Sequence, residues 1–150
     1  MKELTKEMLI NLGITVIKDD SVKYGYIIRR TWNKNSSKEL VTRDLTINEA
    51  VCKHKYSNEK RYPIVTFSAY GKTYSCPLSR IVYAYLKGTI PANYDVDHID
   101  NNQYNNELDN LQLLTRKENL AKRLADNNLT KAPNQYTCAK EARNNDKNER

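Results

Sequence analysis

The chain has 150 residues, of which 39% are hydrophobic and 29% charged, and its formal net charge is +7. This length accommodates one domain with extensions, and the modest apolar content excludes a large core. No apolar run approaches the ~20 residues of a membrane helix, and the N-terminus lacks the apolar centre of a signal peptide, so we expect a soluble, cytoplasmic protein.

Cysteine usage agrees with a cytoplasmic location. Cys52, Cys76 and Cys138 occur singly and far apart, and the sequence has no C-x-x-C pair. This spacing suggests neither a structural zinc site nor a disulfide framework, and it fits a reducing compartment.

The positive charge lies on the two flanks. Residues 1–60 hold twelve Lys/Arg and eight Asp/Glu, residues 120–150 hold seven and four, and residues 61–119 hold six of each. Since phosphate neutralisation supplies much of nucleic-acid affinity, such flanks favour contact with a polyanion, although excess lysine that merely aids solubility is the alternative. We therefore expect three parts: a basic N-terminal α/β extension at 1–60, a core at 61–126, and a basic, partly flexible tail at 127–150.

The N-terminal part predicts a helix, a strand, a hairpin and a second helix. Thr5 is a plausible N-cap for the first helix, and the apolar, β-branched residues 14–17 follow as a strand. Residues 22–42 predict a hairpin, because two β-prone runs enclose a polar turn. Residues 46–49, with the sequence T-I-N-E, fit a capping box and predict a short helix toward residue 55.

The next elements predicted are a hairpin and an amphipathic helix. The hairpin, at 62–76, turns at Tyr70-Gly71, and Pro77 then supplies a favourable first helical position. Gly88 is placed to end the helix. Its apolar side chains recur at the spacing of one helix face, which should pack on the core: Leu78, Ile81, Val82, Tyr85 and Leu86.

The segment 94–119 predicts a strand, a polar loop, a strand and a helix. Alternating side chains suit a half-buried strand at 94–99. Five asparagines and two aspartates within residues 100–110 favour a loop, because these side chains compete for backbone hydrogen bonds. A second strand follows at 111–114, and the capping box T-R-K-E then places Asn119 in the first turn of a helix.

Asp97, His98 and Asn119 can meet if the two strands fold back on each other. A carboxylate and a neutral amide oxygen suit Mg²⁺ or Mn²⁺, hard cations that often also take phosphate oxygens. Histidine titrates near physiological pH, so neutral His98 can accept a proton from water. These groups predict metal-dependent phosphodiester hydrolysis, in which the metal stabilises the departing 3′ oxygen.

From Val96 to Asn119 the chain resembles the HNH endonucleases, the ββα-metal class found in phages, mobile introns and restriction systems. Asn110 lies twelve residues after His98, and Asn119 lies nine residues later. The acid–histidine pair, the N-N-x-L-[DE]-N-L segment and the closing T-x-x-E-N all occur in register. The resemblance implies an α+β fold with a small ββα-metal core at 94–126, preceded by β-hairpins and short helices.

The resemblance also implies a role for each site residue. His98 is the expected general base, Asp97 and Asn119 are the expected metal ligands, and Asn110 is expected to pin the loop so that the histidine points correctly. Asn106 matches another frequently polar loop position. The family often has Gly where Asn101 stands, and Asn tolerates the left-handed backbone better than most residues.

Two structural arguments compete with this interpretation. An Asp-His pair beside an Asn-rich run can be a purely structural feature, although the ordered set of residues favours catalysis. In addition, adjacent strand residues point to opposite faces, so Asp97 and His98 can serve one phosphate only where the strand ends or bends.

Double-stranded DNA is the partner that the resemblance implies, in a bacterium or a phage-infected cell. Lys122 and Arg123 share a helix face with Asn119, where they could hold backbone phosphates. Six basic residues are expected to contact DNA: Arg116, Lys117, Lys122, Arg123, Arg29 and Arg30. Arg29 and Arg30 should project to opposite faces of their strand, where solvated arginines are the alternative. A non-cleaving DNA-binding module on an HNH scaffold is the competing function.

Overall fold

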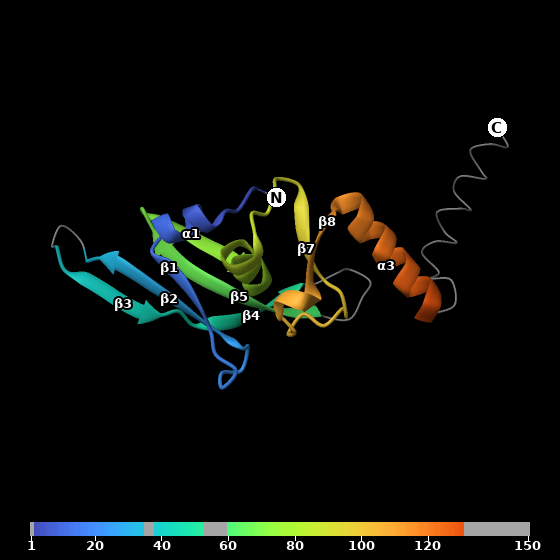
Figure 1. The fold of residues 1–150 in the computed structure, drawn as a ribbon, viewed down its shortest axis with the longest axis horizontal. Coiled ribbons are helices and arrows are strands. Elements are labelled where there is room, and N and C mark those ends of the chain that lie inside the picture. The colour runs from blue at the N-terminus through green and yellow to red at the C-terminus, as the bar shows by residue number, and fades with distance from the viewer. Residues whose placement is uncertain (1, 35–37, 53–59, 131–150) are drawn as a thin grey trace. The chain divides into compact units, whose positions relative to one another are not determined.

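The computed structural model describes residues 2–34, 38–52 and 60–130 (Figure 1). The chain forms two compact units, Met1–Thr115 and Arg116–Arg150. The described residues mix helices with antiparallel strands, which confirms the α+β class predicted from the sequence. None of the described helices is long and apolar enough to span a membrane.

The first sheet confirms the predicted strand and hairpin of the N-terminal region. Its three strands are antiparallel in the order β1–β2–β3, with β1 at Ile14–Lys18, β2 at Tyr26–Asn33 and β3 at Leu40–Asp44. Buried and partly buried residues alternate along β2, because one face of the sheet packs on the core.

Helix α1 (Lys6–Asn11) precedes this sheet, as predicted. Thr5 is its N-cap and accepts a hydrogen bond from the Met8 N–H at 3.1 Å. The turn after the helix needs glycine, because Gly13 has a φ of 77° and a Cβ there would lie 1.9 Å from the Thr31 carbonyl oxygen. The helix can therefore turn directly into β1 beside β2.

Among the described residues, the one element whose type was predicted wrongly lies in the second sheet. Its strands are antiparallel in the order β4–β5–β6, with β4 at Ile47–Cys52, β5 at Lys60–Ala69 and β6 at Lys72–Pro77. The predicted hairpin is confirmed as β5–β6. However, the helix predicted from the capping box at residues 46–49 is strand β4, while residues 53–55 lie outside the described ranges.

Glu49 explains why the capping box does not form. A capping box requires the Glu side chain to reach back to the N-cap N–H. Here the Glu49 carboxylate instead accepts from the Tyr24 hydroxyl at 3.1 Å and from Lys23 Nζ at 3.3 Å. The backbone of β4 pairs with β5 along its length, so distant hydrogen bonds override a local helix signal.

The predicted amphipathic helix is present, but it changes type half-way. Helix α2 (Leu78–Val82) continues as the π-helix η1 (Tyr83–Lys87), and the Gly88 N–H donates to the Tyr83 carbonyl at 2.9 Å. The π-helical bond spans five residues, so it rotates the side chains after Val82. As a result Ala84 is 2% exposed, whereas Leu86, predicted to face the core, is 40% exposed.

The core of the first unit draws on both three-stranded sheets, α1, the α2–η1 helix and β8. Its largest fully buried side chains are aliphatic: Ile14, Ile28, Leu78, Ile81, Ile90, Leu111, Val65 and Val82. Leu111 belongs to β8, so the strand that follows the polar loop is anchored in this core.

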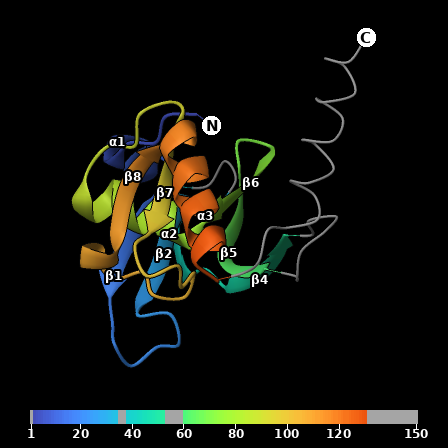
Figure 2. The ribbon, with the colours of Figure 1, turned by 90° about the vertical axis from the view of Figure 1, so that its right-hand side faces the viewer.

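A third, two-stranded sheet carries the acid–histidine pair. Strands β7 (Tyr94–His98) and β8 (Leu111–Thr115) are antiparallel, with Tyr94 opposite Thr115 and His98 opposite Leu111 (Figure 2). The loop between them ends in a short 3-10 helix, η2 (Leu108–Asn110). Both predicted strands and the predicted loop are therefore confirmed.

The second unit begins with helix α3, which spans Arg116–Thr130. The helix predicted from the capping box at residues 115–118 is confirmed. Most of the predicted tail, residues 131–150, lies outside the described ranges.

Candidate active site

Asp97 and His98 are the last two residues of β7. Asp97 lies opposite Gln112 of β8, and Gln112 Nε2 donates a hydrogen bond to Asp97 Oδ2 at 2.8 Å. This bond orients the carboxylate from the neighbouring strand. Gln112 could not be found from the sequence, because its contact with Asp97 follows only from the register of the two strands.

His98 points to the other face of the strand and is buried, with 4% of its surface exposed. Its Nε2 lies 2.8 Å from Oδ1 of Asn106, which is itself 2% exposed. The strand ends at His98, and the Asn101 N–H donates to the His98 carbonyl at 2.9 Å. The chain thus bends immediately after Asp97 and His98. A strand end or bend at this position is what the two side chains need if they are to serve the same phosphate.

Asn101 carries this bend in the left-handed conformation that was expected of it. Its φ is 61°, in the region that asparagine tolerates better than most residues. The turn therefore forms with asparagine at this position.

Asn110 closes the loop onto its own start. Its Oδ1 accepts from the Asp100 N–H at 3.0 Å, and its Nδ2 donates to Asp100 Oδ1 at 2.9 Å and to the Asn105 carbonyl at 2.8 Å. Its carbonyl accepts from the Ile99 N–H at 2.9 Å. Three of these four bonds hold the two ends of the segment 99–110 together, directly after His98, and the bond to Asn105 ties in the middle of the loop.

Asp100 is the charged centre of this loop. Hydrogen bonds from the Asn105 side chain, the Asn102 N–H and the Asn110 side chain hold the pKa of its carboxyl below the usual value. The carboxylate is therefore used inside the loop as a hydrogen-bond acceptor. It was not singled out in the sequence, although its position among asparagines is typical of such a turn.

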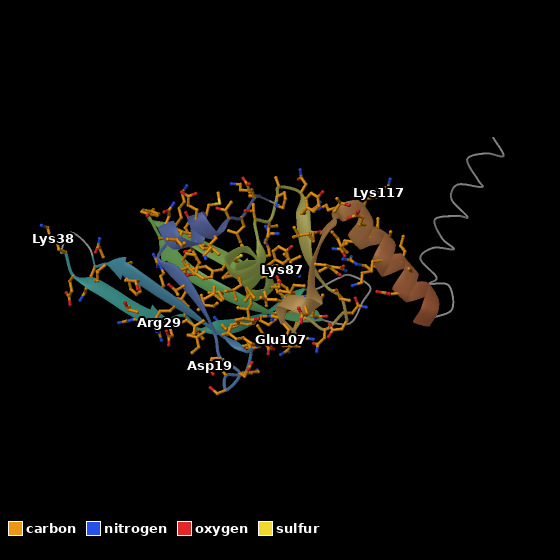
Figure 3. All side chains as sticks on the ribbon, in the orientation of Figure 1. Asp19, Arg29, Lys38, Lys87, Glu107 and Lys117 are labelled. Atoms are coloured by element: carbon orange, nitrogen blue, oxygen red, sulfur yellow. The ribbon has the colours of Figure 1, made fainter. Side chains whose placement is uncertain are left out.

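The rest of the first unit also holds the loop. Lys87 Nζ, at the end of η1, donates to the carbonyls of Leu108 at 2.8 Å and Leu111 at 2.6 Å, and Lys18 of β1 forms an ion pair with Glu107. Lys87 and Glu107 are labelled in Figure 3. Lys18 and Glu107 are 89 residues apart in the chain, so the sequence alone could not pair them.

Comparison with known proteins places this region in a family. Residues 76–121 match the family model described as HNH endonuclease. The match begins at the end of β6, contains the complete β7–loop–β8 segment, and extends into the first residues of α3. Residues 76–121 are therefore similar to HNH endonucleases. The family resemblance predicted from the sequence is thus confirmed.

The chain is also similar over part of its length to a phage protein. The chain is 44% identical over 52 residues to Protein 3.8 of Escherichia phage T7, an alignment that covers 34% of this chain and 43% of the phage protein. The chain therefore spans less than half the length of the relative that it matches. No solved structure matches the chain.

The chemistry of the side chains near the HNH loop fits a hard divalent cation. HNH nucleases generally use divalent metals. No group of three or more His, Cys, Asp and Glu able to hold a metal occurs among the residues that the structure describes. If Asp97 and Asn119 hold the ion, as predicted from the sequence, oxygens of water and phosphate would have to complete its coordination.

Asn119 belongs to the second unit, unlike Asp97, His98 and Asn110. It lies in the first turn of α3, where Lys122 and Arg123 follow it at the spacing of one helix face. Because Asp97 and Asn119 belong to different units, their meeting around one metal ion stays a prediction.

Arg29 and Arg30 project to opposite sides of β2, as predicted, and only one of them lies at the surface. Arg29 donates to both carboxylate oxygens of Asp44, at 2.7 and 3.3 Å. Arg30 is 9% exposed and donates to the carbonyls of Leu12 and Ser68. The interior position of Arg30 argues against the DNA contact expected of it, and the candidate on this strand is Arg29.

Proposed function

We propose that the chain is a metal-dependent HNH endonuclease that hydrolyses phosphodiester bonds of double-stranded DNA. The observation that carries this proposal is the matched segment itself, in which Asp97 and a buried His98 end one strand and Asn110 closes the loop behind them. Its catalytic part is the core 61–126, with a ββα-metal motif at 94–126. The alternative is a module that binds DNA on this scaffold without cutting it.

Each residue has a chemical role in this proposal. His98 accepts a proton from the attacking water, and Asn110 holds the loop that follows His98. Asp97, oriented by Gln112, and Asn119 would hold Mg²⁺ or Mn²⁺. When bound there, the ion would supply charge that stabilises the phosphoryl oxygens and the departing 3′ oxygen.

The basic flanks supply affinity for the DNA backbone in this proposal. Residues 1–60 form an extension that contacts DNA, residues 127–150 form a basic tail, and α3 carries four of the cations. The residues proposed to contact phosphates are Arg116, Lys117, Lys122, Arg123 and Arg29. Contacts of this kind fix the position of the protein on the duplex without reading its sequence.

Supercoiled plasmid separates the two functions. The wild-type protein with Mg²⁺ or Mn²⁺ should convert the plasmid to relaxed or linear DNA, and a chelator or the His98→Ala substitution should prevent this. The variant should still shift DNA in a gel, because His98 is not among the residues proposed to bind the backbone. Plasmid that stays supercoiled at every pH and metal tested, while it is bound, would identify the non-cleaving module.

A further inference from the structure

Asn106 and His98 form a buried polar pair behind the loop. They are 2% and 4% exposed, and Asn106 Oδ1 lies 2.8 Å from His98 Nε2. Water cannot easily replace either partner at such burial, so this bond constrains the imidazole more strongly than a surface contact would. Sequence reasoning recognised position 106 only as a frequently polar position in the loop.

The chemistry of the amide decides which imidazole nitrogen carries the proton. A carbonyl oxygen of an amide only accepts hydrogen bonds, so the hydrogen in this bond belongs to Nε2. A neutral imidazole has one N–H, so Nδ1 then holds the lone pair. An amide turned by half a rotation would donate from Nδ2 and would require the opposite tautomer.

The orientation of the Asn106 amide leaves its Nδ2 atom without a hydrogen bond within the described part of the chain. It is buried and has no hydrogen-bond partner among the residues that the structure describes. Its partner in the pair is therefore the oxygen alone, and the only hydrogen bond described for this side chain is the one to His98. The described polar contact of the Asn106 side chain is with His98, so Asn106 is placed to orient the imidazole.

We propose that Asn106 is a positioning residue that fixes neutral His98 as the Nε2–H tautomer, so that Nδ1 takes the proton from water. This inference rests on the proposed nuclease function. In the step, the O–H bond of water breaks and its proton moves to Nδ1, while the water oxygen forms a bond to phosphorus. The bond from phosphorus to the 3′ oxygen breaks, the departing oxygen takes a proton from solvent, and Nδ1 later returns its proton to solvent.

A neutral amide suits this task better than a carboxylate. Either group accepts from Nε2–H, but a carboxylate would also stabilise the imidazolium and keep the base protonated to higher pH. One carboxylate already interacts with the imidazole, since His98 is among the causes that lower the pKa of the Asp100 carboxyl. Asn106 fixes the tautomer without adding negative charge beside an incoming phosphate.

Two substitutions separate this role from a purely structural one. Asn106→Leu has a similar size and removes both the bond to His98 and the unpaired Nδ2, so the protein should remain folded by circular dichroism. Its kcat on plasmid should fall on the order of 10- to 100-fold with KM nearly unchanged, as for groups that orient a catalytic histidine. Asn106→Asp should restore most of the rate at high pH, with the acidic limb of its pH–rate profile moved to higher pH.

Nitrogen-15 NMR of the histidines tests the tautomer without any cleavage assay. The chain has two histidines, and the His98→Ala variant assigns their signals. Neutral His98 should be protonated at Nε2 in the wild type and should become a mixture of tautomers in Asn106→Leu. A wild-type protein protonated at Nδ1, or an Asn106→Leu variant with an unchanged rate and pH profile, would overturn the inference. An uncut plasmid would instead refute the nuclease proposal and leave the NMR result standing.

Discussion

Replacement of Asn110 by alanine tests whether one side chain closes the catalytic loop. Asn110 is buried, and two of its side-chain hydrogen bonds go to backbone groups, the Asp100 N–H at 3.0 Å and the Asn105 carbonyl at 2.8 Å. A typical hydrogen bond contributes a net ~1 kcal/mol, so the loss of both should lower the free energy of unfolding by about 2 kcal/mol. The third bond, to the exposed Asp100 carboxylate, is not counted because solvent screens it.

Urea denaturation measures this change directly, and Asn102→Ala is the matched control. Asn102 stands in the same loop, but its side chain accepts a single hydrogen bond, from the Tyr104 N–H at 3.1 Å, and is exposed. The control should therefore lose less than about 1 kcal/mol. For Asn110→Ala we also expect a Tm lower by about 4–8 °C and a kcat that falls while the protein is still folded. If both variants unfold at the same urea concentration, Asn110 does not pin the loop.

Three further predictions concern acid stability, metal use and salt. The pKa of the Asp100 carboxyl is lowered in the folded protein, so the carboxylate stabilises the fold above the unfolded pKa and loses this effect as the pH falls. The free energy of unfolding of Asp100→Asn should therefore depend less on pH in the acidic range. An unchanged slope would contradict this prediction. Gln112→Leu should lower the apparent metal affinity about 10-fold, because Asp97 loses the hydrogen bond that orients its carboxylate. Mg²⁺ titrations of DNA cleavage measure this change. An unaltered titration curve would show that the bond is dispensable. Residues 131–150 hold five Lys/Arg and three Asp/Glu, so their removal should make DNA affinity depend less steeply on salt concentration. Fluorescence anisotropy measures this affinity. An equal slope of affinity against salt would show that these residues make no phosphate contacts.

Much of the first unit was predictable because its signals are local. Alternation of side chains predicted β7, Pro77 and Gly88 marked the two ends of the α2–η1 helix, and Asn101 was expected in the left-handed conformation that it adopts. Local signals failed where a distant partner decided the outcome. The capping box at residues 46–49 became β4 because β5 pairs with its backbone and Tyr24 takes its glutamate.

The candidate site divides along the same line between local and distant determinants. Asp97 and His98 were singled out by their chemistry and Asn110 by the family resemblance, and each lies beside or within the loop as expected. Spacing could not identify Gln112, because its contact with Asp97 depends on the register between two strands. It also could not show that Arg30 turns inward, since alternation predicts opposite faces without saying which face is buried.

The asparagines of the loop can be understood together through the charge of the substrate. Asn101 takes the left-handed turn, Asn102 and Asn105 accept from backbone N–H groups two residues on, and Asn110 closes the loop. Aspartate could replace several of these as a hydrogen-bond acceptor. Each aspartate would, however, add a negative charge close to where a phosphodiester would bind in the proposed function, and it could not donate as the Asn110 amide does. In the proposed function, amides at these positions hold the loop around the Asp100 carboxylate and repel the phosphate less than further carboxylates would, and Asn106 extends the same principle to His98.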